Sequence, residues 1–116
     1  MSLVDPTQAL LEAAMRGAWQ RQTALTDNLA NADTPGYRPE EVNFEATLRS
    51  AINSGISPAG VEFETEAKPL QEGPNGSSVS VDEESAKLAE NSLDYEALTD
   101  VVNTRNAILK SAMGLS

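Results

Sequence analysis

A helical pattern runs into a turn in the stretch Asn28-Leu29-Ala30-Asn31-Ala32-Asp33-Thr34-Pro35-Gly36-Tyr37-Arg38. Thr34 precedes a proline, and the proline ring disfavours the α conformation in the residue before it, so a helix arriving from the N-terminal side must end there. Pro35 and Gly36 supply the fixed φ and the positive φ that the two central positions of a type II turn require. Tyr37 therefore leaves the turn in a new direction.

Two asparagines, Asn28 and Asn31, lie on one face of the last helical turns before this stop. Each side-chain amide can donate and accept hydrogen bonds toward another segment of backbone. The residues alone favour a simpler interpretation, a helix C-terminus with local polar capping. They leave open whether the two amides bond within the chain or across to a neighbouring chain.

An amphipathic helix is predicted ahead of the turn. Asp5 suits the N-cap position, and Pro6 suits the first helical position because its missing N–H would have no partner there. Apolar residues then recur at alternating spacings of four and three, which places them on one stripe of a helix. We assign residues 1–33 to this helix, with a packing seam that contains Leu11, Met15, Ala18, Leu25 and Leu29.

The same helix carries a patch of small residues, Ala13, Ala14, Gly17 and Ala18. Glycine costs a helix about 1 kcal/mol relative to alanine, and close approach of another helix would offset that cost. The alternative is a tolerated glycine on an exposed face.

A second long helix is predicted over residues 80–116. Ser80 and Glu83 fit a capping box, and the carboxylates of Asp82, Glu83 and Glu84 complement the helix dipole; we interpret them as solvated. Asn91 and Arg105 lie near the seam and either set its register or face solvent. The seam contains Leu88, Tyr95, Leu98, Val102 and Leu109, and a second apolar row contains Ala86, Leu93, Ala97, Val101, Ile108 and Ala112. Two rows suggest more than one partner helix.

The middle of the chain, residues 34–79, is predicted to be a turn followed by an irregular or partly disordered linker. Within it, Asn43 can cap a short helix over Phe44, Leu48 and Ile52, and residues 61–66 alternate apolar and acidic side chains like a half-buried strand. The predicted fold class is mainly α. Two long terminal helices pair as an antiparallel coiled-coil hairpin in a single structural domain, and the middle adds a short helix and a small β-element.

Composition excludes several functions. The chain has 116 residues, a formal net charge of -10, no histidine and no cysteine. Nucleic acids and anionic membranes would repel such a surface. The usual general base, thiolate nucleophile and transition-metal ligands are absent, so we predict no catalytic, cofactor-binding or metal residues and no enzymatic activity. No segment is predicted to span a bilayer, and residues 1–6 lack the features of a cleaved signal peptide.

The turn also carries a family signature. An amphipathic N-terminal helix followed by Asn, x, Ala, Asn, x, x, Thr, x, Gly, aromatic, basic resembles the signature of bacterial flagellar basal-body rod, hook and hook-associated proteins. Residues 38–46 and 86–98 resemble, within that family, the smallest subunits of the proximal rod. The signature positions, which the resemblance implies to be subunit contacts, are Asn28, Ala30, Asn31, Thr34, Pro35, Gly36 and Tyr37.

The resemblance implies a structural rod subunit without a cofactor, which packs with copies of itself and with other rod proteins into a helical tube that transmits torque and forms part of the export channel. It implies a FliE-type adaptor at the rod base as a further partner, a periplasmic location in the flagellar basal body, and passage through the flagellar type III export gate without a cleaved signal. Phe44 and Leu48 resemble the element that engages this gate; the alternative is a small core contact. A competing function is a soluble helical adaptor or export chaperone that binds a partner's helix.

Overall fold

The computed structural model describes residues 6–69 and 79–114. Two long helices frame a small middle region, as the sequence predicts, and the predicted small β-element consists of two short strands. In chain order, the elements are α1 (Pro6–Ala30), β1 (Glu40–Val42), α2 (Phe44–Asn53), the short 3-10 helix η1 (Pro58–Gly60), β2 (Thr65–Ala67) and α3 (Val81–Ala112).

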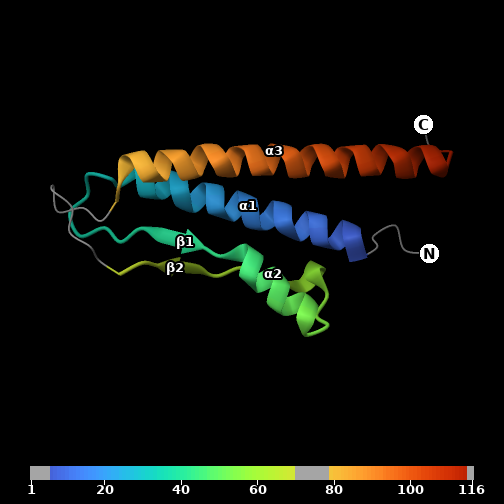
Figure 1. Ribbon diagram of the computed structural model, residues 1–116, viewed down its shortest axis with the longest axis horizontal. Coiled ribbons are helices and arrows are strands. Elements are labelled where there is room, and N and C mark those ends of the chain that lie inside the picture. The colour runs from blue at the N-terminus through green and yellow to red at the C-terminus, as the bar shows by residue number, and fades with distance from the viewer. Residues whose placement is uncertain (1–5, 70–78, 115–116) are drawn as a thin grey trace.

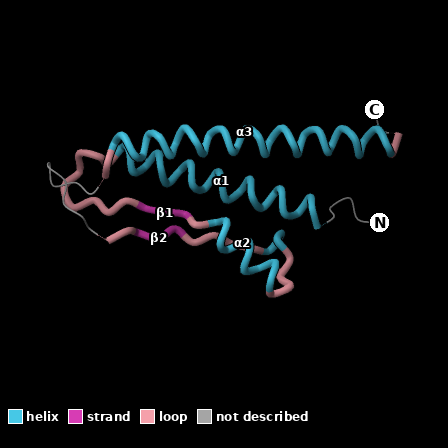
Figure 2. Tube along the Cα trace, viewed as in Figure 1, coloured by secondary structure: helices cyan, strands magenta, loops and turns pink. Residues whose placement is uncertain are grey.

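α1 is the central element of an elongated molecule with extents of 60 × 31 × 14 Å. The antiparallel α3 packs along one side of it, and the strands, α2 and η1 lie on the other side (Figure 1). The tube in Figure 2 shows the same order of elements by secondary structure. The predicted antiparallel helical hairpin is confirmed, and α1 additionally supports the middle region.

Polar side chains connect α1 to α3 at widely separated points. Asn91 is buried, and its Nδ2 donates to the Ala18 carbonyl oxygen at 2.8 Å and to Gln22 Oε1 at 2.9 Å. Further along, Arg105 Nε donates to Gln8 Oε1 at 3.1 Å. A slip of one helix along the other would break these bonds and leave buried polar groups without partners. The structure therefore supports the register-setting interpretation of Asn91 and Arg105.

The ends of the long helices follow local rules. Ser80 Oγ accepts a hydrogen bond from the Glu83 N–H at 3.3 Å, which caps α3 as predicted. α1 ends at Ala30, slightly before the predicted boundary. Beyond it the chain tightens, because the N–H of Ala32 bonds to the Leu29 carbonyl oxygen, three residues back, at 3.2 Å.

The middle region is more regular than the predicted linker. α2 starts at Phe44 as expected, although Asn43 occupies its N-cap without a side-chain capping bond. β1 and β2 pair antiparallel, with Val42 opposite Thr65. A strand is expected over residues 61–66, but in the structure β2 begins only at Thr65 and ends at Ala67. The predicted alternation nevertheless appears in the burial, since Val61 and Phe63 pack against the core while Glu62 and Glu64 are exposed.

The hydrophobic core lies where β1 and α2 meet α1. Its buried members are Ala13, Ala18, Ala24, Val42, Phe44 and Leu48. Small side chains on α1 let the larger ones from the middle region approach its backbone. Among the described helices, none is both long and apolar enough to cross a membrane.

Candidate functional site

The turn after α1 has the geometry that its sequence predicts. Gly36 has a φ of 78°, and the Tyr37 N–H donates to the Thr34 carbonyl oxygen at 3.2 Å. A positive φ at the third residue together with this bond is typical of a type II turn. Thr34, Pro35 and Gly36 are exposed residues, while Tyr37 is half-buried and folds back toward α1.

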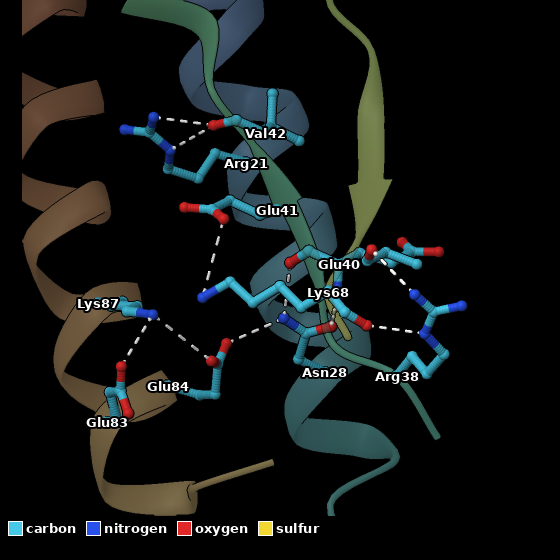
Figure 3. A network of polar contacts seen from close by, with 11 residues as sticks. Arg21, Asn28, Arg38, Glu40, Glu41, Val42, Lys68, Glu83, Glu84 and Lys87 are labelled. Atoms are coloured by element: carbon cyan, nitrogen blue, oxygen red, sulfur yellow. Dashed lines mark hydrogen bonds and ion pairs between the residues drawn. The ribbon is translucent and has the colours of Figure 1, made fainter. Parts of the chain in front are cut away.

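Asn28 lies at the centre of a buried network that joins α1, β1 and α3 (Figure 3). Its Nδ2 donates to the Glu40 carbonyl oxygen and to Glu84 Oε2, both at 2.9 Å. Its Oδ1 accepts from the Glu40 N–H at 2.9 Å and from the Tyr37 hydroxyl at 3.1 Å. An asparagine amide has two donor hydrogens and two acceptor lone pairs, so its whole capacity is used within the chain.

Asn31 acts differently, although it has the same side chain and lies one turn away. Its Nδ2 donates to the Asp27 carbonyl oxygen at 2.9 Å, and its Oδ1 accepts from Thr34 Oγ1 at 3.2 Å. Both bonds are local, so Asn31 caps the end of α1. Ala30 is exposed at the same helix end. Local capping therefore holds for Asn31, whereas Asn28 bonds to distant elements.

Glu84 was interpreted as solvated, and the structure shows this to be wrong. Its side chain is buried. Its Oε2 accepts a hydrogen bond from Asn28 Nδ2, and its Oε1 lies 3.8 Å from Lys87 Nζ. Burial of a carboxylate requires such partners. A signal was present in the sequence, since Glu84 precedes the seam residue Leu88 by four positions and Asn91 by seven, and thus shares their helix face.

The environment of Tyr37 favours its neutral, hydrogen-bond-donating form. Burial raises the pKa of the Tyr37 phenol, and the carboxylates of Glu40, Asp27 and Glu84 raise this pKa further. The hydroxyl therefore remains protonated at neutral pH and can donate to Asn28.

Phe44 and Leu48, the proposed export-gate element, are buried in the core. The Phe44 ring lies directly on the backbone of Gly17, where an added Cβ would stand 2.4 Å from Phe44 Cγ. The structure therefore supports close approach as the interpretation of the small-residue patch, and the helix that approaches α1 is α2. In the folded chain, Phe44 and Leu48 make the core contact that the sequence analysis gave as the alternative interpretation. Their role at the export gate stays a prediction.

Arg21, which the sequence did not single out, fastens the start of α2 to α1. Its Nε and Nη2 donate to the Val42 carbonyl oxygen at 3.1 and 2.9 Å, and its Nη1 donates to Glu45 Oε1 at 2.7 Å. The guanidinium carbon also lies 4.3 Å from the centre of the Phe44 ring. Hydrogen bonding from Arg21 to the Glu45 carboxylate lowers the pKa of the Glu45 carboxyl below its ordinary value.

We expect the Arg21 and Glu45 pair to make the fold weakly sensitive to acid. Because the pKa of Glu45 is lower in the folded chain, the pair stabilises the fold above the ordinary glutamate pKa and loses this effect as pH falls through the lowered value. The Glu45 side chain is 52% exposed, so the contribution is below about 1 kcal/mol. The free energy of unfolding in urea, measured as a function of pH, should fall less steeply in acid for Glu45→Gln than for the exposed control Glu62→Gln. Equal slopes would contradict the assignment.

The residues predicted to form the seam between α1 and α3 are covered to different depths. Buried members are Ala18, Leu25 and Val102, and half-buried members are Leu11, Met15, Leu29, Leu88, Tyr95, Leu98 and Leu109. The second row of α3 is uncovered. Its large members, which we call the outer row, are Leu93, Val101 and Ile108, exposed by 67%, 50% and 63%. A row of exposed apolar side chains along one helix face is typical of an interaction surface.

The carboxylates do not form a recognisable ion site. Within residues 6–69 and 79–114, no group of three or more Asp or Glu side chains is arranged to hold a metal ion. The described residues instead form packing surfaces around the hydrogen-bond network at Asn28.

Comparison with known proteins identifies the family of this chain. Residues 11–38, which include most of α1 and the turn, match the model of a family described as flagella basal body rod protein. The chain is 32% identical over 127 residues to the flagellar basal body rod protein FlgB of Bacillus subtilis (strain 168), with 97% of each chain covered. It is 30% identical over 114 residues to FlgB of Escherichia coli (strain K12), with 80% of this chain and 82% of that one covered. The chain therefore belongs to the FlgB family of flagellar basal body rod proteins.

Proposed function

We propose that this protein is a structural subunit of the proximal rod, without enzymatic activity, and that its helices pack against neighbouring subunits to build a helical tube. The tube transmits torque and forms part of the export channel. The outer row of α3 is the observation that carries the proposal, because the hairpin leaves this apolar surface uncovered. Contacts between different surfaces of successive subunits build open helical assemblies when they do not close into a ring.

The proposed partners are copies of this chain, other rod proteins, a FliE-type adaptor at the rod base and the flagellar type III export gate. The assembled protein would lie in the periplasmic part of the basal body and would reach it without a cleaved signal. Burial of Phe44 and Leu48 fits passage in an unfolded form, because the gate could contact these side chains only in a chain that has not folded.

A charge placed in the outer row tests the proposal. Leu93→Asp should abolish rod assembly and swimming while it leaves the helix content of the purified protein unchanged, since Leu93 is 67% exposed. Leu98 is a less selective position because it packs against the core. Asn103→Asp is the matched control, because it adds the same charge at an exposed polar position of α3.

The readouts are motility, the amount of the variant in purified basal bodies and the circular dichroism of the isolated protein. Normal rods with Leu93→Asp would overturn the proposed packing. Recovery of the wild-type protein in a soluble complex, and not in basal bodies, would instead favour the adaptor or chaperone function.

A further inference from the structure

A shallow groove runs along the side of α1 that neither α3 nor the strands cover. It has a volume of about 840 Å³, and its apolar lining includes Met15 and Trp19 of α1 and Tyr95 and Val102 of α3. Trp19 is 60% exposed, and its ring centre lies 5.8 Å from that of Tyr95. A tryptophan held by a neighbouring aromatic ring and still open to solvent is a typical anchor of a protein interface.

The charged residues along this groove are mainly acidic. Glu12, Asp27 and Glu40 line it, and the one cation among its described lining residues is Arg16. The Arg16 guanidinium is directed to η1 and the residue after it, because Nη2 donates to the carbonyl oxygens of Pro58 at 3.2 Å and Val61 at 3.4 Å.

We propose that the groove binds a basic amphipathic helix of a different protein chain. Apolar side chains of that helix would cover Trp19 and Met15, and its lysines and arginines would face Glu12 and Asp27. A second copy of this chain is a poor occupant of the groove, because none of its described helices is basic: α1 and α2 carry as many acidic as basic side chains, and α3 carries more acidic ones. The inference rests on the proposed function. Within the rod, it assigns this face of the subunit to a neighbouring protein that differs from this chain and is basic.

Trp19 is the only tryptophan of the chain and therefore reports on its own groove. The full chain would be titrated with a synthetic peptide of about 20 residues, long enough to form a helix, with one apolar face and lysine or arginine elsewhere. The Trp19 emission should shift to shorter wavelength and saturate. A scrambled peptide of the same composition should cause no such shift, and a peptide with glutamate in place of the basic residues should bind at least about tenfold more weakly.

A pair of charge variants tests whether binding occurs in the groove. Asp27→Asn combined with Glu12→Gln should weaken binding of the basic peptide at least about threefold, and added salt should reduce the difference from the wild type. Asp100→Asn combined with Glu96→Gln removes the same charge from exposed positions on α3 outside the groove and should leave the affinity unchanged.

Three results would overturn the inference: equal binding of the scrambled peptide, an unchanged Trp19 emission, or equal affinities of the two double variants. Sedimentation that shows dimers of the chain alone, with the Trp19 emission already shifted, would assign the groove to a second copy instead. The test of rod assembly with Leu93→Asp does not involve the groove, since Leu93 does not line it. Failure of the inference is therefore distinguishable from failure of the proposed function.

Discussion

Replacing Asn28 with leucine is expected to lower the free energy of unfolding by about 3–5 kcal/mol, because each buried polar group that loses its partner costs about 1–3 kcal/mol, and a charged one costs more. Leucine has a similar size but makes none of the four hydrogen bonds of Asn28. The Glu84 carboxylate and the Glu40 N–H and carbonyl groups would lose a partner at the place where three elements meet. Domains of this size have a total stability of about 5–15 kcal/mol, so the variant should be close to unfolding.

Asn31→Leu is the matched control for this prediction. It makes the same chemical change one helical turn away, but it removes only two local bonds at a half-exposed position, and its cost should be below about 1 kcal/mol. Urea unfolding followed by circular dichroism measures both values. Glu84→Gln should have an intermediate effect, because the amide oxygen can still accept from Asn28. Equal losses of unfolding free energy for the two asparagine variants would show that the network in Figure 3 does not stabilise the fold.

Features that depend on near neighbours in sequence could be predicted. The turn at Pro35 and Gly36, the cap at Ser80 and the start of α2 at Phe44 each follow from residues within one helical turn. The seam and the outer row of α3 could also be predicted, because helical periodicity alone separates one face from another.

Features that depend on the pairing of distant residues could not be predicted from the sequence. The helix face of Glu84 follows from its spacing to Leu88 and Asn91, but its partner Asn28 lies 56 positions away, and no local pattern pairs the two residues. β1 and β2 are three residues each, too short for alternation to reveal them. The groove at Trp19 exists only because α3 and the strands lie on either side of α1, so nothing in the sequence near Trp19 indicates it.

Gly17→Ala is expected to lower the free energy of unfolding by about 1–3 kcal/mol, the usual cost of overpacking a core. Helix propensity alone predicts the opposite sign, a gain of about 1 kcal/mol. The contact decides between them, because the new Cβ would meet Phe44 Cγ at 2.4 Å and Phe44 Cβ at 2.7 Å, close to the backbone of α2 rather than at a flexible tip. Gly60→Ala is the control, since a Cβ there meets nothing within 4 Å, and its effect should be near zero.

A double-mutant cycle with Phe44→Ala attributes the loss to this contact. Phe44→Ala alone should cost about 3–5 kcal/mol, and Gly17→Ala should cost much less in its presence, so the two losses should not add. Additive losses, or a stabilised Gly17→Ala protein, would contradict the packing of Phe44 on Gly17. The same variants separate folding from export, because Gly17→Ala leaves Phe44 and Leu48 intact in the unfolded chain. If the gate contacts Phe44 as proposed, Gly17→Ala should be exported normally, whereas Phe44→Ala should lose export as well as stability.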